Sequence, residues 1–224
     1  DAIPDYTLVD VAENITRLDF ALLKRSLTKH SSGLYLLPRP VHLKDVAAIT
    51  PEDFQRVIGL LKATFTHVII DLSKSYSELD MVALRSAQHA LMITQLDLPC
   101  LRNVVRLMMS FAEEDGMKER TKIVVNRVGL GSGEISLKKA QETIDREVFW
   151  QLPNDYRTMV EVRNNGVPLI EHAPKAGITQ AIREMAEALT GNVSESGEDS
   201  KTMSSWFKFF AKNGNVKKPV EKSD

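Results

Sequence analysis

Apolar residues along the chain alternate between short continuous runs and helical spacings. The first continuous run is Thr66-His67-Val68-Ile69-Ile70-Asp71. Because its β-forming residues follow one another without polar alternation, the run predicts a strand buried on both faces. Asp71 then stands at the carboxyl end of that strand, where α/β sheets place their functional residues.

The same two patterns repeat on either side of this run. Further strands are predicted at residues 33–37, 90–94, 122–126 and 147–152. Helices are predicted over residues 6–23 as short pieces, over 50–61, 79–89 and 101–108, and from residues 155 and 177. Thr50-Pro51 is a typical helix start, with a capping hydroxyl before a proline at the first helical position. Alternation of strand and helix predicts an α/β fold: a doubly wound, mostly parallel sheet with helices on both faces.

The pattern changes after residue 191. Residues 192–200 are rich in Ser, Gly, Asn and acidic residues, which predicts a linker after a domain at 1–191. Residues 201–224 are rich in lysine and are predicted to be a flexible tail, in which the spacing of Met203, Trp206, Phe207 and Phe210 predicts one helical face. This face is expected to dock on a membrane surface or in a partner's groove, or else to fold back onto the domain.

Composition narrows the possible functions. The 224 residues carry a formal net charge of −1. This near-neutral charge argues against a nucleic-acid-binding protein whose whole surface contacts phosphates. Cys100 is the only cysteine, so an internal disulfide is excluded, as expected in a reducing cytoplasm. The chain opens with Asp1-Ala2-Ile3-Pro4-Asp5, without methionine, and we expect further sequence upstream.

Two stretches are tested as parts of a nucleotide site. Asp71 has the Walker B type of placement, in which a carboxylate holds Mg²⁺ directly or through water; the alternative is a turn-forming aspartate. The glycine-rich turn at residues 129–133 follows a predicted strand, but Glu134 and Ile135 stand where a P-loop has Lys and Ser or Thr. We therefore interpret the glycines as a connection and not as a phosphate cradle.

Five segments carry a resemblance to a known family. The first two are His67-Val68-Ile69-Ile70-Asp71-Leu72, in the Walker B position, and Thr94-Gln95-Leu96-Asp97-Leu98-Pro99-Cys100-Leu101-Arg102-Asn103. The others are Val124-Val125-Asn126-Arg127, Leu152-Pro153-Asn154-Asp155 and Asn164-Asn165-Gly166-Val167-Pro168-Leu169. In the order and spacing of these segments, residues 5–191 resemble the MinD/ParA group of P-loop ATPases, and most closely its CpaE/TadZ pilus-assembly branch.

The resemblance implies ATP and Mg²⁺ as ligands and gives several residues a role. Asp71 would serve Mg²⁺. Asn126 would pair with the adenine edge, since an amide presents a donor and an acceptor side by side. Pro153 would pack against the base, and Arg127 and Asp155 belong to the same adenine-holding segments. Without the resemblance, Asn126 would be interpreted as capping its own strand and Pro153 as a strand terminator.

One family feature is absent from the printed sequence. No Lys-Gly-Gly loop followed by Lys-Thr or Lys-Ser occurs in it, so the predicted P-loop NTPase-like sheet lacks its N-terminal strand and its P-loop. Because that loop supplies most phosphate contacts in the family, the sequence alone does not decide whether this chain hydrolyses ATP. Either the chain is a fragment whose P-loop half lies upstream, or it is a degenerate member that binds partners only.

Three functions are therefore weighed. The leading hypothesis is a CpaE/TadZ-like protein that places and assembles a pilus or secretion apparatus at the inner membrane. It would act by nucleotide-linked homodimerisation and partner binding, in the cytoplasm or peripherally at the membrane. The alternatives are an active MinD/ParA-type cycling ATPase in spatial positioning and a nucleotide-free interaction module.

Overall fold

The computed structural model describes residues 4–40, 42, 45, 48–73, 75–131 and 133–191. The chain divides into two compact units, residues 1–182 and 183–224. The described part of the second unit is the end of helix α11 (Gly177–Thr190) and one residue beyond it. The linker predicted at 192–200 and the tail at 201–224, with Met203, Trp206, Phe207 and Phe210, lie outside the described residues.

Short helices and a small hairpin open the first unit, as the spacing over residues 6–23 predicts. The elements are α1 (Leu8–Glu13), η1 (Ile15–Arg17), α2 (Phe20–Arg25), β1 (Thr28–Lys29), β2 (Tyr35–Leu36) and α4 (Pro51–Thr64). The hydroxyl of Thr50 accepts a hydrogen bond from the Asp53 amide at 3.1 Å, which confirms the predicted start of α4. Strand β2 is shorter than the predicted 33–37, because its partner β1 has only two paired residues.

These elements enclose one apolar cluster of their own. Its buried members are Val11, Ala12, Leu23, Leu27, Ile49, Phe54, Val57, Ile58 and Ala83. Leu23 and Val57 are fully inaccessible to solvent. Ala83 comes from α5 (Glu78–Ser86), so this helix is anchored to the N-terminal cluster.

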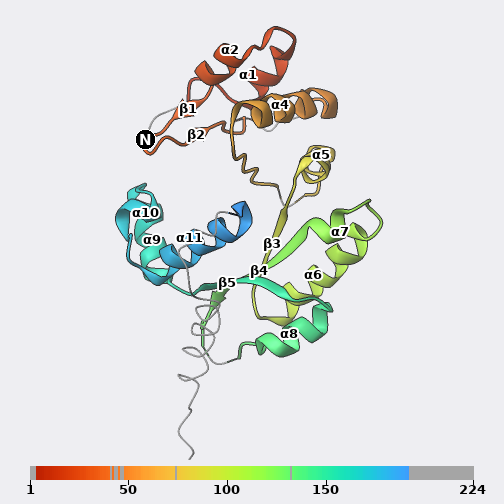
Figure 1. Cartoon of the computed structure of the whole chain (residues 1–224), viewed down its shortest axis with the longest axis vertical. Coiled ribbons are helices and arrows are strands. Elements are labelled where there is room, and N and C mark those ends of the chain that lie inside the picture. Colours follow the sequence, from red (N-terminus) through yellow and green to blue (C-terminus); the bar gives the residue numbers. More distant parts are fainter. Residues whose placement is uncertain are drawn as a thin grey trace, which may run out of the picture. The chain divides into compact units, whose positions relative to one another are not determined.

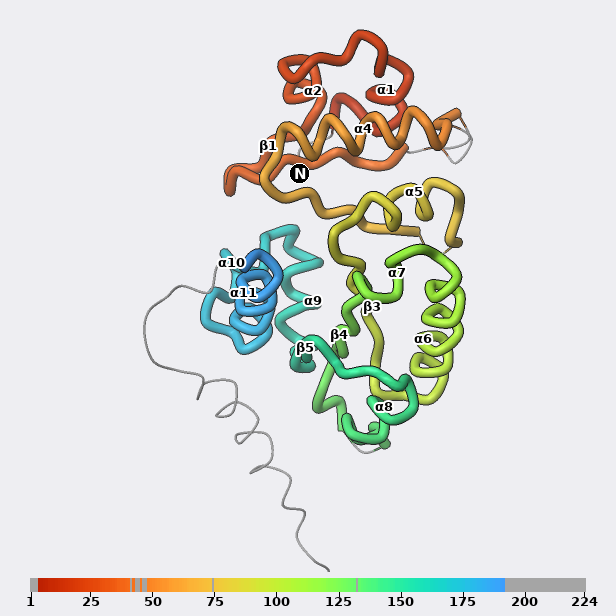
Figure 2. Tube along the Cα trace, turned by 45° about the vertical axis from the view of Figure 1, so that its right-hand side comes forward, coloured from red at the N-terminus to blue at the C-terminus, as the bar shows by residue number. Residues whose placement is uncertain are grey.

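A parallel sheet in the order β3-β4-β5 forms the second part of the first unit, which confirms the predicted α/β class (Figure 1). Its strands are β3 (Ala90–Thr94), β4 (Thr121–Val128) and β5 (Val148–Pro153). The connecting helices are α6 (Leu98–Phe111), α7 (Met117–Arg120), α8 (Leu137–Ile144), α9 (Tyr156–Asn165) and α10 (Leu169–His172). In both views α6 and α8 lie on one side of the sheet and α9 and α10 on the other (Figure 2).

Strand β4 is the centre of this sheet. Ile123, Val124 and Val125 are 1%, 0% and 1% exposed, as a strand covered on both faces requires. Ile123 and Val125 belong to the apolar cluster that includes Leu101 of α6, and Val124 faces the other way because side chains alternate along a strand. Edge strand β3 is less covered, and its Leu91 and Ile93 are exposed.

The prediction of a strand at residues 66–71 is wrong for this structure. The segment has no regular secondary structure, Asp71 is exposed, and the side chain of Ile69 is 93% exposed. A strand buried on both faces needs a hydrogen-bonded neighbour on each side, and no described segment pairs with this one. Apolar composition alone therefore does not make residues 66–71 a strand.

Among the described residues, none of the helices combines the length and apolar character needed to cross a membrane.

Candidate functional site

The carboxyl end of β4 is bulged at the two residues of greatest interest. Val125 lies opposite Gln151 and Val128 lies opposite Pro153, so β4 has one residue more than β5 between the two pairs. Arg127 takes up the extra length with a left-handed φ of 58°. The Oδ1 atom of Asn126 accepts a hydrogen bond from the Arg127 amide at 2.9 Å. Bulges of this kind redirect side chains at the rim of a sheet.

The neighbouring end of β5 is tied to this bulge. The Asn154 amide donates to the Val128 carbonyl at 2.9 Å, directly after Pro153. Asp155 then caps α9, since its Oδ1 atom accepts from the Thr158 amide at 3.2 Å. Four predicted site residues, Asn126, Arg127, Pro153 and Asp155, therefore meet at the adjacent carboxyl ends of two parallel strands.

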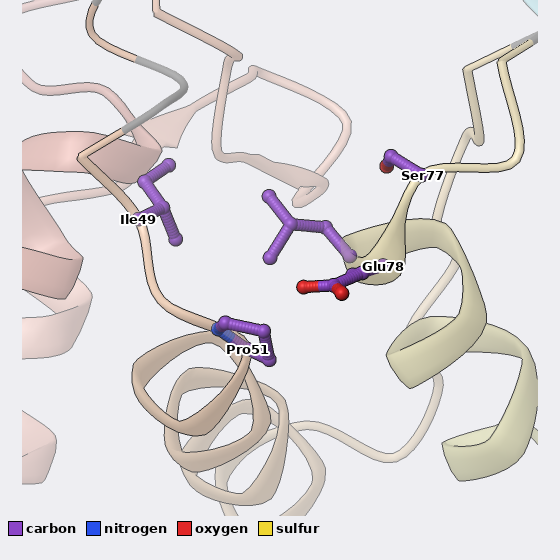
Figure 3. Close-up of a pocket in the computed structure, with 5 residues that line it drawn as sticks. Ile49, Pro51, Ser77 and Glu78 are labelled. Carbon is purple, nitrogen blue, oxygen red and sulfur yellow. The ribbon is translucent and has the colours of Figure 1, made fainter.

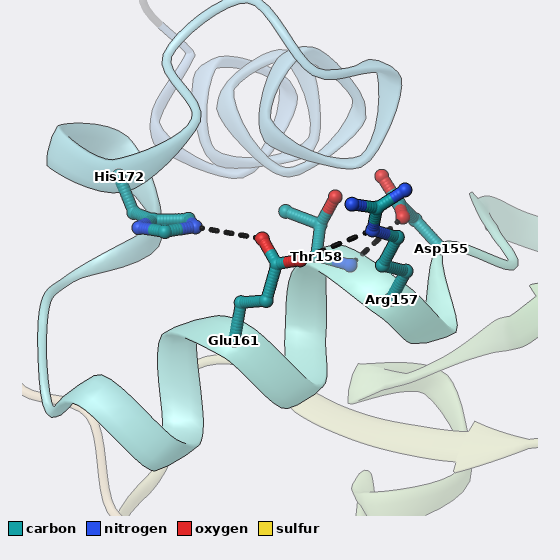
Figure 4. Close-up of polar contacts among 5 residues, drawn as sticks. All are labelled: Asp155, Arg157, Thr158, Glu161 and His172. Atoms are coloured by element: carbon teal, nitrogen blue, oxygen red, sulfur yellow. Dashed lines mark hydrogen bonds and ion pairs between the residues drawn. The ribbon is translucent and has the colours of Figure 1, made fainter.

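Helix α9, which Asp155 starts, is held in place by one carboxylate (Figure 4). Glu161 accepts from the Arg157 guanidinium at 3.1 Å, and its other oxygen lies 3.2 Å from Nε2 of His172 on α10. These hydrogen bonds, that of His172 first, hold the pKa of Glu161 below its ordinary value. The pair Glu161 and His172 thus ties α9 to α10 beyond the end of β5.

Asp71 is not joined to this group. It lies in the segment between α4 and α5, and among the described residues its carboxylate has no hydrogen bond or ion pair. No set of three or more His, Cys, Asp or Glu side chains in the described part of the chain could hold a metal ion. Asp71 could therefore contribute one carboxylate to Mg²⁺, with the remaining ligands coming from water or phosphate oxygens.

The glycine-rich turn after β4 has its own internal carboxylate. The amides of Gly129 and Leu130 donate to Glu134 at 3.3 and 2.8 Å. A phosphate cradle needs free amides, and a phosphate here would meet the negative charge of Glu134. The residues therefore do not fit a phosphate group, in agreement with the interpretation of this turn as a connection.

A hollow of about 260 Å³ lies between the starts of α4 and α5 (Figure 3). It is lined by Ile49, Pro51, Ser77, Glu78 and Leu79, which include none of the predicted site residues. Small-molecule sites are commonly about 300–1,000 Å³ in volume. The carboxylate of Glu78 would also repel a phosphate group, so we do not assign a nucleotide to this hollow.

The predicted site residues do not include the most extensively bonded carboxylate near Asp71. Asp80, at the start of α5, is only 6% exposed and accepts hydrogen bonds from Ser73 and Ser77. The spacing Ser77-x-x-Asp80 is a capping signal that could have predicted the contact with Ser77. Its contact with Ser73 depends on the path of the loop, which sequence spacing does not give.

Comparison with known proteins finds MinD proteins among the relatives of this chain. No protein-family model matches the chain. The chain is 27% identical over 194 residues to the septum site-determining protein MinD of Bacillus subtilis (strain 168), covering 83% of this chain and 69% of that protein. It is 26% identical over 170 residues to a putative MinD of Tupiella akineta, covering 74% of this chain and 53% of that protein.

Solved structures of the same kind share the fold. A ParA family ATPase from Chlorobium tepidum TLS superposes with a TM-score of 0.77 at 23% identity, covering 84% of this chain and 76% of that chain. MinD of Pyrococcus horikoshii OT3, complexed with Mg-ADP, superposes with a TM-score of 0.68 at 22% identity, covering 84% of this chain and 74% of that chain. The MinC:MinD complex of Aquifex aeolicus superposes with a TM-score of 0.67 at 21% identity, covering 86% of this chain and 76% of that chain. The chain thus shares the fold of the MinD and ParA ATPases and is similar in sequence to MinD proteins.

Proposed function

We propose that this chain belongs to a CpaE/TadZ-like protein that helps place and assemble a pilus or secretion apparatus at the inner face of the membrane. It acts by nucleotide-linked homodimerisation and by binding assembly proteins, and not by rapid turnover of ATP. The segment at residues 94–103, which carries the resemblance to this branch, caps and starts α6: Asp97 accepts from the Cys100 amide at 2.8 Å.

The observation that carries the proposal is the meeting of Asn126, Arg127, Pro153 and Asp155 at the ends of β4 and β5. In open α/β sheets, ligands bind outside the carboxyl ends of the strands. The Asn126 Oδ1 atom already accepts from the Arg127 amide, while its NH₂ group has no partner in the described part of the chain and is free to donate to a base. Pro153 offers an apolar, half-buried ring beside it.

The phosphate end of a nucleotide has no comparable partner. The amides of Gly129 and Leu130 are taken by Glu134, and the printed sequence has no Lys-Gly-Gly loop. The described residues therefore support contacts with adenine but not with the triphosphate. When bound, Mg-ATP would supply the charge that links two copies of the protein; this chain's residues would hold its base and, through Asp71, its metal.

A nucleotide-free interaction module is the second candidate. The specific observation in its favour is Glu134, because a carboxylate on the only glycine-rich turn after a sheet strand in the described residues opposes anion binding. In this case the ends of β4 and β5 would contact a protein partner.

Nucleotide titration followed by NMR separates the two candidates. With the 224-residue chain, adenosine, ADP and ATP with Mg²⁺ should shift the same amide signals around Asn126 and Pro153 at millimolar concentrations, because the base supplies the contacts. Asn126→Ala should abolish these shifts, and Asn165→Ala, an exposed asparagine at the end of α9, should not. Absence of any shift supports the interaction module, and a micromolar isotherm for ATP in calorimetry contradicts the missing phosphate contacts.

The role of Asp71 requires a chain with a phosphate loop. In a longer chain that carries a Lys-Gly-Gly loop before Asp1, Asp71→Ala should abolish Mg²⁺-dependent dimerisation and leave the fold intact, since Asp71 is exposed. Light scattering after size exclusion measures the dimer, with Asp115→Ala as a control at another exposed aspartate. An unchanged dimer in Asp71→Ala would disprove the Walker B role.

The tail is assigned to membrane or partner binding from its sequence. Met203, Trp206, Phe207 and Phe210 would form the docking face, with neighbouring lysines adding attraction to anionic lipid. The intact chain should sediment with anionic vesicles, and Trp206→Glu combined with Phe210→Glu should remain in the supernatant. Equal sedimentation of both proteins would exclude membrane docking through this face.

A further inference from the structure

Positive charge is concentrated in the N-terminal part of the first unit. Residues 14–40 contain five basic residues and one acidic residue, whereas the whole chain has a formal net charge of −1. The acidic residue, Asp19, caps α2 by accepting a hydrogen bond from the Leu22 amide at 2.7 Å. The basic residues, all exposed, are Arg17, Lys24, Arg25, Lys29 and Arg39.

These five cations are not used in ion pairs within the described part of the chain. Other arginine and lysine side chains do have carboxylate partners; the pairs are Arg56 with Asp53, Arg85 with Glu114, Lys138 with Glu142, and Arg157 with Glu161. Lys29 contacts an aromatic ring instead, with its Nζ atom 5.8 Å from the centroid of Tyr35. The charges of residues 14–40 are therefore available to an anionic partner.

One face of the β1–β2 hairpin is apolar and exposed. Side chains alternate along residues 34–37, and Tyr35 and Leu37 pack against the N-terminal cluster. The ring centroid of Tyr35 lies 5.2 Å from that of Phe65, which follows α4. Leu34 and Leu36 alternate with these residues and are 63% and 53% exposed. The hairpin is thus held by one face, and its leucine face is open to solvent.

Helix α2 is also held by one side only. Leu23 is buried in the N-terminal cluster. Leu36 of the hairpin pairs with Thr28, three residues after Arg25, so only a short turn separates the end of α2 from the hairpin. In both views α2 and the hairpin lie together beside α4 (Figure 2). The exposed side chains of α2 include Phe20, Leu22, Lys24 and Arg25.

We propose that α2 and the hairpin dock on the surface of an anionic lipid bilayer. The docking residues, here called the N-terminal surface, are Phe20, Leu22, Lys24, Arg25, Leu34 and Leu36. Lysine and arginine would lie at the headgroup phosphates, and the apolar side chains would enter the interface, as in other proteins that bind a bilayer from one side.

Two other partners fit these residues less well. Nucleic acid offers phosphates, but its backbone gives little cover to four large apolar side chains. A second copy of the chain would bring the same unpaired positive charges together, and like charges repel. That a membrane is at hand rests on the proposed function, whereas the N-terminal surface itself needs neither a nucleotide nor the tail.

The N-terminal surface alone should bind weakly. A single small membrane contact is marginal and reversible, and stable anchoring takes two signals. The second signal would be the tail with Trp206 and Phe210. The chain with Trp206→Glu and Phe210→Glu should therefore stay in the supernatant and still touch vesicles transiently at high lipid concentration.

Tryptophan fluorescence tests the N-terminal surface apart from the tail. In the 224-residue chain with Trp206→Glu and Phe210→Glu, Leu36→Trp places a reporter on the exposed face of the hairpin. Vesicles of phosphatidylglycerol with brominated acyl chains should quench this reporter, because bromine quenches a tryptophan that it contacts. Vesicles of brominated phosphatidylcholine should not quench it. The same chain without Leu36→Trp gives the background from Trp150.

Charge reversal on this reporter chain tests the cations. Lys24→Glu with Arg25→Glu should raise the phosphatidylglycerol concentration for half-maximal quenching at least about thirtyfold, since each cation near anionic lipid contributes about fivefold to binding. Lys138→Glu with Lys139→Glu makes the same change in net charge at an adjacent, exposed pair on α8 and should have a far smaller effect. Leu34→Ser, an uncharged change, should also weaken quenching.

Three results would overturn the proposal. One is no quenching by brominated phosphatidylglycerol at any lipid concentration, and another is an equal loss from the two charge reversals. The third is a rise in the anisotropy of labelled duplex DNA without quenching by lipid, which would assign the N-terminal surface to nucleic acid. Because the tail is disabled throughout and no nucleotide is added, failure of tail docking or of ATP binding leaves these results unaffected.

Discussion

The run Ile123-Val124-Val125 and the run Val68-Ile69-Ile70 each place three β-branched residues before a short polar side chain, Asn126 in one case and Asp71 in the other. The first is the central strand of the sheet and is at most 1% exposed. The second has no regular secondary structure and no partner strand among the described residues, and its Ile69 is 93% exposed.

Neighbours account for the difference. Strand β4 is hydrogen-bonded to β3 on one side and β5 on the other, so its backbone polar groups are satisfied where the side chains are buried. The segment at 66–71 has no partner strand; Ile70 packs against the N-terminal cluster, and Ser73 beyond the segment donates two hydrogen bonds to Asp80. β-Branched residues thus fit a strand only where other strands complete it.

The largest expected effect is in β4. Val124→Ala removes two methyl groups from a fully buried position, so the free energy of unfolding should fall by about 2–3 kcal/mol. Urea unfolding followed by circular dichroism measures the change. A loss below about 0.5 kcal/mol, the range of ordinary surface substitutions, would contradict the burial of this strand in solution.

The second prediction concerns Asp80 in α5, which accepts hydrogen bonds from Ser73, two residues after Asp71. Burial is the largest influence on Asp80 and raises its pKa, but the hydrogen bonds from Ser73 and Ser77 together outweigh burial and leave the pKa below its ordinary value. A carboxyl with a lowered folded-state pKa stabilises the fold above its unfolded-state pKa and loses that contribution as pH falls through the folded-state value. Asp80→Asn should therefore cost about 1–2 kcal/mol at neutral pH, where a charged acceptor is replaced.

The difference in the free energy of unfolding between wild type and Asp80→Asn should shrink as the pH falls below the ordinary pKa of an aspartate, because the Asp80 carboxylate then becomes protonated. Urea unfolding over a pH series measures it, and Val124→Ala serves as the control because its cost has no titrating origin. A difference that stays constant down to the lowest pH would show that Asp80 does not contribute through its charge.

The sequence predicted those parts of the fold that local rules decide. The capped start of α4, the strands around Val124 and Leu152, and their parallel order follow from periodicity and capping residues. Ile69 was misassigned because burial of a strand depends on which other strands pair with it. At the candidate site, the spacing of Asn126 and Pro153 placed both at strand ends. The bulge at Arg127 could not be predicted, because it arises from the register between β4 and β5.

The third prediction tests that bulge. Arg127→Gly should stabilise the protein by about 0.5–1 kcal/mol, since glycine adopts a φ of 58° without strain but loses more chain entropy on folding. Thermal unfolding measures the gain. Arg127→Ala retains the Cβ atom and should give no gain, so equal stabilisation by both would place the cause in the lost charge and not in the backbone.

The smallest expected effect is at Ile69, and it is the sharpest test of the comparison. A side chain that is 93% exposed has little to lose, so Ile69→Ala should change the free energy of unfolding by no more than about 0.5 kcal/mol. The measurement is the same urea titration used for Val124→Ala, at several protein concentrations. If Ile69→Ala costs as much as Val124→Ala at every concentration, residues 66–71 are covered within the monomer and the two runs do not differ. If the cost grows with concentration, a second copy covers Ile69, because stability that depends on association follows mass action.

Ile69→Lys then separates these cases directly: a charged side chain at an interface weakens self-association, which light scattering detects, and leaves the stability of the dilute monomer unchanged.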